Sequence, residues 1–164
     1  MILVTHGIVG AAVALSAVGD IPLAGLLAFL SHFVLDAIPH WDYKINSLEE
    51  KENKEEMEIK NGINLYSDIM KVAFDGLLGI SVPLIIVFLI GKKYFFIALL
   101  GSSLAILPDF LQALYFKTHT PLLHHFMRFH TYIHSRIRLD NRPIFGGILQ
   151  LLLMAITVVY MMSI

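Results

Sequence analysis

Residues 68–90 read DIMKVAFDGLLGISVPLIIVFLI, residues 94–116 read YFFIALLGSSLAILPDFLQALYF, and only Gly91-Lys92-Lys93 separates them. A helix that crosses a bilayer needs about 20 apolar residues, and both segments reach this length. A connection of three residues predicts that the two helices are antiparallel neighbours. This stretch therefore predicts a helical hairpin in a membrane.

Three further apolar segments flank the hairpin, at residues 5–18, 22–38 and 143–163. Pro22 suits the first turn of a helix, and Pro39 forces the preceding residue out of the helical region. Residues 143–163 are long enough to span, and residues 22–38 are borderline. Residues 5–18 are too short, so we expect this helix to be partly embedded, shielded by neighbours, or matched to a thin bilayer.

The composition supports a membrane protein. Hydrophobic residues make up 57% of the 164 residues, charged residues make up 15%, and the mean hydropathy is +0.72. Soluble domains are roughly 45–50% apolar. We therefore expect one all-α domain over residues 1–164, an integral membrane bundle of about five helices. The N-terminus lacks the basic region of a signal peptide, so we expect the first helix to be retained.

Two polar stretches, residues 39–67 and 117–142, connect the predicted spans. The first interleaves glutamates with lysines, which is typical of a solvated loop or an exposed helix. The second mixes aromatic residues with histidines and four arginines, and this composition favours an interfacial helix that caps the bundle.

The loop charges predict the orientation. Nine lysines and arginines lie on the side that carries residues 40–67 and 117–142, and two, Lys92 and Lys93, lie on the other side. Because positive residues are retained in the cytoplasm, this asymmetry places the first side there. We expect a multi-pass protein of the inner (plasma) membrane.

Histidines and aspartates fall at the segment ends that face this cytoplasmic side. His32 and Asp36 are four residues apart, so they share one helix face and can bind the same metal ion. An ionisable residue within an apolar span is costly and usually marks a functional site. The alternatives are a satisfied buried histidine and, for Asp109, an interfacial cap. The predicted metal ligands are His6, His32, Asp36, His40, Asp109, His130 and His134.

The chain has no cysteine, so the ligands are nitrogen and oxygen atoms, and we expect Zn²⁺ or another divalent cation. Asp75 and Asp109 are lone carboxylates in apolar segments and need a counter-charge. Pro108 is expected to kink its helix and to turn Asp109 inward. We interpret Asp75 and Asp109 as catalytic candidates.

Four motifs resemble the membrane-bound metal-dependent hydrolases of bacterial and archaeal inner membranes. They are Thr5-His6-Gly7-Ile8-Val9-Gly10, His32-Phe-Val-Leu-Asp36, Pro108-Asp109 and His130-Thr131-Tyr132-Ile133-His134-Ser135. That family typically shows Pro-Asp-Xaa-Asp and His-Arg-Gly-Xaa-Thr-His-Ser. Here Leu111 replaces the second aspartate, and the histidines are four residues apart instead of five. The His-x-x-x-Asp spacing is also similar to ligand pairs in zinc-dependent phospholipase C.

The resemblance implies a metal-dependent hydrolase without fixing its substrate. A site near the headgroup layer predicts a lipid phosphate or ester as the substrate, with Arg128 and Arg136 binding its phosphate. These arginines are equally suited to anchoring the protein on anionic lipid.

Two other classes of function remain open. One is a divalent-metal or proton transporter, although a conduction path needs polar residues throughout the bilayer and the far halves of the segments have few. The other is a non-catalytic membrane scaffold. The net charge of -1 gives no reason to expect a nucleic-acid partner, and a homo-oligomer is compatible with the sequence.

Overall fold

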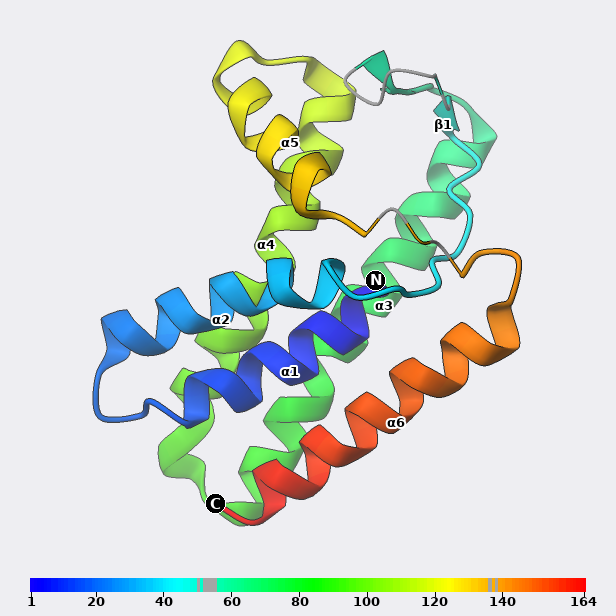
Figure 1. Cartoon of the computed structure of the whole chain (residues 1–164). Helices are drawn as coiled ribbons and strands as arrows, with labels where there is room; N and C mark the ends of the chain where they lie inside the picture. The colour runs from blue at the N-terminus through cyan, green and yellow to red at the C-terminus, as the bar shows by residue number, and fades with distance from the viewer. Residues whose placement is uncertain (50, 52–55, 136, 138) are drawn as a thin grey trace.

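The structure is a computed structural model that describes residues 1–49, 51, 56–135, 137 and 139–164. Helices dominate these residues, so the predicted all-α bundle is confirmed (Figure 1). The elements are α1 (Leu3–Leu15), α2 (Ile21–Asp36), β1 (Leu48–Glu49), β2 (Glu58–Ile59), α3 (Ile63–Ile90), the 3₁₀ helix η2 (Lys92–Tyr94), α4 (Phe95–Thr118), α5 (Pro121–Ile133) and α6 (Pro143–Met162).

Helices α3, α4 and α6 are long and apolar enough to cross a membrane, with 28, 24 and 20 residues. Their outer faces expose large apolar side chains, among them Leu89 on α3, Phe110 on α4 and Leu151 on α6. Contiguous exposed apolar surface of this kind is unfavourable in water and suits contact with lipid. The chain is a membrane protein with three candidate spans, and α1 and α2 are shorter apolar helices.

Helix α1 is the centre of the bundle. Ten of its 13 residues are buried, and it packs against α2, α3, α4 and α6. Small residues allow the close approach: a Cβ added at Gly101 of α4 would lie 2.6 Å from the carbonyl oxygen of Gly10. Of the three alternatives for the short first segment, shielding by its neighbours is the one that the structure shows.

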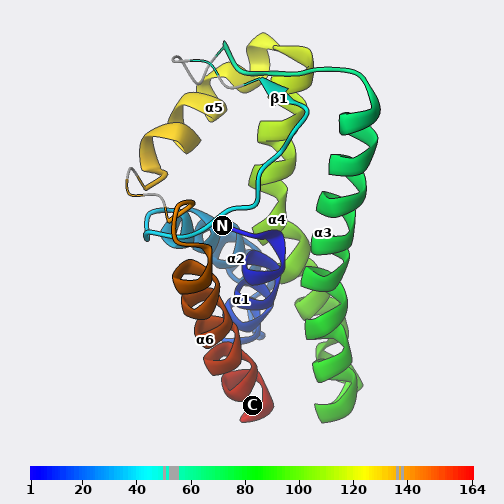
Figure 2. The same ribbon diagram turned by 90° about the vertical axis from the view of Figure 1, so that its right-hand side faces the viewer.

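Helices α1 and α2 form a hairpin that crosses the long axis of the molecule obliquely (Figures 1 and 2). Asp20 caps α2 by accepting a hydrogen bond from the Leu23 amide at 3.0 Å, and Pro22 lies in the first turn as predicted. Helix α2 ends at Asp36, before Pro39. This end of α2 meets the start of α1, so His6 and His32 come together.

Helices α3 and α4 extend further than the apolar pattern predicted. Helix α3 begins at Ile63 and α4 ends at Thr118, so Asp75 and Asp109 lie well inside their helices rather than near the ends. The extension of α3 is supported by Asp68, which accepts a hydrogen bond from the Ser47 amide and pairs with Lys71. The predicted histidine and aspartate ligands, from His6 to His134, form the layer discussed below. Further turns of α3 and α4 extend past this layer.

A second, smaller core covers that layer. It contains Tyr115 and Phe116 of α4 and Met127 of α5, with the β1–β2 hairpin packed against it. The hairpin is antiparallel, with Leu48 opposite Ile59, and lies where the sequence predicted only a loop or an exposed helix. His119 follows the last residue of α4 as its C-cap with a left-handed φ of 47°, and α5 begins at Pro121. Helix α5 is the predicted capping segment.

Candidate metal centre

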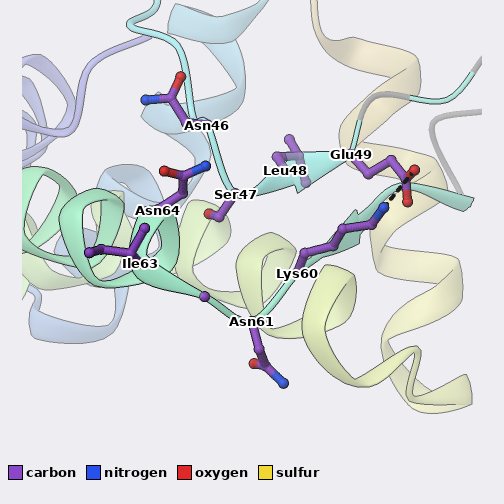
Figure 3. A pocket seen from close by; sticks show the side chains of 9 residues that line it. Asn46, Ser47, Leu48, Glu49, Lys60, Asn61, Ile63 and Asn64 are labelled. Carbon is purple, nitrogen blue, oxygen red and sulfur yellow. Dashed lines mark ion pairs between the residues drawn. The ribbon is translucent and has the colours of Figure 1, made fainter.

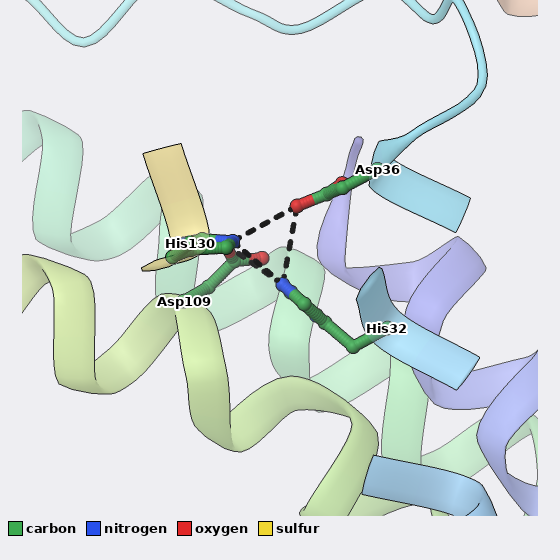
Figure 4. Close-up of side chains that lie close together, drawn as sticks. All are labelled: His32, Asp36, Asp109 and His130. Atoms are coloured by element: carbon green, nitrogen blue, oxygen red, sulfur yellow. Dashed lines mark hydrogen bonds and ion pairs between the residues drawn. The ribbon is translucent and has the colours of Figure 1, made fainter. Parts of the chain in front are cut away.

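Three helices bring four side chains to one buried point. His32 and Asp36 come from adjacent turns of α2, Asp109 comes from α4 and His130 comes from α5 (Figure 4). The side chains of His32, Asp36 and His130 are fully buried or nearly so, whereas Asp109 is 23% exposed. His130 turns inward because Met127 and His130 lie on the buried face of α5.

Three of these side chains form a nearly equilateral triangle of ligand atoms. The Nε2 atoms of His32 and His130 are 3.0 Å apart, and Asp36 Oδ2 lies 3.1 Å from the first and 3.0 Å from the second. Asp109 Oδ1 lies 3.7 Å from His32 Nε2. Ligands about 2.0–2.1 Å from a tetrahedral zinc ion are about 3.3 Å apart. The four atoms thus have the spacing of a metal site.

Backbone contacts fix the tautomer of His32. Its Nδ1 donates a hydrogen bond to the carbonyl oxygen of Ala105 at 2.8 Å. A carbonyl only accepts, so Nδ1 carries the proton and the neutral ring presents a lone pair at Nε2. This lone pair faces a carboxylate oxygen and a second imidazole nitrogen. Either a proton on His130 Nε2 or a metal ion can satisfy these atoms, and the group can hold a metal ion.

His6 borders the same point. Its ring stacks on His32 with the centroids 4.1 Å apart, and the side chain is fully buried. Its Nε2 lies 3.2 Å from Asp36 Oδ1 and 3.9 Å from Asp109 Oδ2, but neither ring nitrogen makes a hydrogen bond with the described residues. A buried imidazole without a hydrogen bond is costly, which is consistent with a role beside a cation.

A second group shares Asp36. Asp36, His40 and His134 each offer one ligand atom, all within 4.8 Å of one another. His40 Nδ1 donates to the Ile38 carbonyl at 2.7 Å, and His134 Nδ1 donates to the Ser135 carbonyl at 3.4 Å. Both Nε2 atoms are therefore left for other partners. Burial lowers the pKa of His134 to about 4, despite the nearby Asp36, so its ring is neutral at pH 7.

Asp42 and the amino group of Met1 lie beside this second group. Asp42 Oδ2 is 3.2 Å from His40 Nε2, and the Met1 nitrogen lies 3.0 Å from Asp42 and 3.1 Å from Asp36. Burial alone would raise the pKa of Asp42, but the contacts with His40 and the Met1 amino group hold it well below its usual range. Asp42 is therefore ionised at neutral pH.

Asp75 has a structural task that the sequence did not predict. Its carboxylate accepts hydrogen bonds from the amides of Leu3 and Val4, at 2.7 and 3.0 Å, and from the hydroxyl of Tyr43 at 3.1 Å. Burial and the charge of Asp75 raise the pKa of Tyr43, which keeps this donor protonated. Asp75 caps the first turn of α1 from α3 and thereby positions His6. It belongs to neither group of potential ligands found among the described residues.

The sequence also predicted two phosphate-binding arginines. Arg128 is exposed on α5, and Arg136 lies outside the described residues. All seven predicted metal ligands, in contrast, lie in or beside the two groups. The structure also brings Asp42 beside the second group, and it adds Gln150, which the sequence prediction omitted. Gln150 accepts from the Ile2 amide at 3.2 Å and donates to the Trp41 carbonyl at 2.8 Å, so an amide side chain within the apolar run 143–163 was a usable signal.

A pocket lies away from these groups, beside the β1–β2 hairpin. It has a volume of about 510 Å³ and is lined by residues 46–49 and 60–64 (Figure 3). Its ionisable pair is Lys60 and Glu49, 2.8 Å apart and largely exposed. An exposed pair of this kind contributes little and offers no chemistry. The buried histidine and aspartate groups are therefore the better candidate site.

Comparison of the chain with known protein families, with curated proteins and with solved structures finds no match. The resemblance to membrane-bound metal-dependent hydrolases therefore rests on the sequence motifs and stays a prediction.

The capping role of Asp75 predicts a loss of stability. Asp75→Ala should lower the free energy of unfolding by about 2 kcal/mol, the upper end for loss of a helix cap, because two amides of α1 and one hydroxyl lose their acceptor. Thermal unfolding in detergent, followed by circular dichroism, measures the change. Asp20→Ala is the matched control, since it removes one exposed cap contact and should cost less. Equal effects of the two substitutions would contradict the role of Asp75.

Proposed function

We propose that this protein is a membrane-embedded, zinc-dependent hydrolase that acts on a lipid phosphate or ester near the cytoplasmic headgroup layer. The observation that supports it best is the triangle formed by His32 Nε2, His130 Nε2 and Asp36 Oδ2, with sides of 3.0–3.1 Å. The donor set of imidazole and carboxylate groups fits zinc, which binds both at about 2.0–2.2 Å. The motif resemblance supports the same reaction class.

The two carboxylates of the first group differ in exposure, and we assign their roles from this difference. The side chain of Asp36 is 1% exposed and faces two imidazoles, so it acts as a ligand. Asp109 is 23% exposed and lies at the edge of the group, where it can take a proton from an incoming water. A bound zinc ion supplies Lewis acidity, which lowers the pKa of its water to about 7 and stabilises charge on a phosphoryl or carbonyl oxygen.

The second shell of this site keeps the ligands in position. The Ala105 carbonyl holds the ring of His32, and Asp75 fixes the first turn of α1 and with it His6. Contacts of this type orient ligand rings and fix their tautomers, and their loss typically costs about 10- to 100-fold in metal affinity or activity. We therefore assign Asp75 as a positioning residue, in place of the catalytic role that the sequence suggested.

The lipid substrate is inferred from the setting of the site. The groups lie within a bundle whose outer surface is apolar, and α5 carries exposed Phe129 and Tyr132 beside Arg128. Aromatic and basic residues together favour the headgroup region, where a phosphate group is available to an arginine. The excess of basic residues in the loops supports a cytoplasmic position for this side of the bundle.

A transporter receives less support. The larger buried core of the bundle consists of apolar residues. It includes Ala11, Ala14, Ala24, Ala98 and Met161. This core offers no series of ionisable side chains along the described part of the bundle. A proton or an ion that reached the site would meet an apolar barrier beyond it.

Metal content is the first test. Protein purified in detergent should contain zinc or another divalent ion, and the double variant His32→Ala, Asp36→Ala should lose it, because two ligand atoms of the triangle are removed. Loss of metal should also lower stability, by about 2.7 kcal/mol at a metal concentration 100 times Kd. Elemental analysis and thermal unfolding measure both effects. His125→Ala, an exposed histidine on α5, is the control, and metal retained by the double variant would overturn the site.

The reaction is tested with lipids. Asp109→Asn should lower turnover by about 10²-fold or more while the protein stays folded, because a general base is lost with little change in volume. The assay offers phospholipids and polyprenyl phosphates with Zn²⁺ or Mn²⁺ and measures released headgroup or phosphate. Asp20→Asn is the control, since it lies on the opposite side of the bundle. Absence of turnover with every lipid, combined with metal flux into vesicles, would favour the transporter instead.

Sidedness can be measured directly because the chain has no cysteine. Single cysteines at the exposed positions Lys51 and Asn141 should react with an impermeant reagent only from the cytoplasm, and one at the exposed Lys93 only from the opposite side. Labelling of cells and of inverted membrane vesicles provides the comparison. Reaction of Lys51→Cys and Asn141→Cys from different sides would contradict the proposed orientation.

A further inference from the structure

We propose that Asp36 bridges two metal ions, one held with His32 and His130 beside Asp109 and the other held with His40 and His134. This inference rests on the proposed metal-dependent function and adds a second ion to it. The two groups of potential ligands that the structure forms share a single residue, Asp36. A carboxylate shared in this way is the usual link in two-metal sites, where ions about 3.5–4 Å apart stabilise both the attacking and the leaving oxygen.

The carboxylate of Asp36 lies near the imidazoles of both groups. Its Oδ2 lies 3.1 Å from His32 Nε2, 3.0 Å from His130 Nε2 and 3.9 Å from His134 Nε2. Its Oδ1 lies 4.0 Å from His40 Nε2, and it also contacts the Met1 amino group at 3.1 Å and His6 Nε2 at 3.2 Å. Oxygen atoms of one carboxylate are thus within 4.0 Å of a ring nitrogen from each group.

The imidazoles of the second group are prepared as ligands in the same way as His32. Each of His40 and His134 donates its Nδ1–H to a backbone carbonyl, that of Ile38 and that of Ser135. Metal-bound histidines are commonly oriented by this kind of contact at the nitrogen that does not bind the ion. Asp42 Oδ2, 3.2 Å from His40 Nε2, offers a further oxygen.

The charges of the site also favour two ions. Asp36, Asp42 and Asp109 bring three carboxylates to the imidazoles of the two groups, and uncompensated buried charge is costly. One divalent ion leaves negative charge on the side of Asp42, where the amino group of Met1 also lies. The second ion and this amino group are thus alternative sources of positive charge, and the metal stoichiometry distinguishes them.

The test is the number of ions per chain. Purified protein is treated with chelator, reloaded with Zn²⁺, freed of excess metal and measured by elemental analysis. We expect two ions in the unaltered chain, one in the double variant His40→Gln, His134→Gln, and two in the control His125→Gln. Circular dichroism and gel filtration in detergent verify that each variant is folded. Loading with Mn²⁺ gives a second measurement. Two manganese ions that share a carboxylate couple magnetically and change the electron paramagnetic resonance spectrum. The double variant should lose this coupling.

The outcomes separate this inference from the proposed function. One ion in the unaltered chain and one in the double variant would overturn the second site and leave the hydrolase proposal standing. Two ions in both would also overturn it, since the second ion would then be bound elsewhere. No metal in any form would overturn the proposed function and the second site together.

Discussion

The buried carboxylate of Asp36 is the interaction on which the rest of the site depends. It is surrounded by His6 of α1, His32 of its own helix and His130 of α5, all within 3.2 Å of one of its oxygens. A carboxylate in this environment is strongly unfavourable unless a cation compensates it, either a proton on a neighbouring imidazole or a metal ion. Because the partners come from different helices, the same charge also determines how α1, α2 and α5 meet.

This arrangement requires the helices to approach closely, and small residues on α1 and α4 make that possible. At the contact between Gly10 and Gly101 there is no room for a side chain, so the backbones of α1 and α4 lie directly against each other. A short helix such as α1 can then sit among longer ones without facing lipid along its length. The cap that Asp75 provides satisfies the amides at its start, where water is scarce.

Sequence reasoning found the helices and most of the candidate site because both follow from local rules. Apolar length identified α3, α4 and α6, and the i, i+4 spacing placed His32 and Asp36 on one face. The ends of α3 and α4 beyond the apolar runs were missed, because they include polar residues such as Asn64, Ser67 and Lys117, which an apolar pattern does not count. The role of Asp75 was missed for a different reason: a lone aspartate in an apolar segment predicts a functional carboxylate, and only the fold shows the amides of α1 beside it.

The central claim is that the Nε2 lone pairs of His32 and His130 face a metal ion together with Asp36. Nitrogen magnetic resonance of ¹⁵N-histidine-labelled protein loaded with ¹¹³Cd²⁺ tests it at the level of single atoms. The account predicts cadmium–nitrogen coupling at Nε2 of both rings and a proton on Nδ1 of His32, which donates to the Ala105 carbonyl. Protonated Nε2 atoms without coupling, in the presence of saturating cadmium, would contradict it and would show that protons alone compensate Asp36.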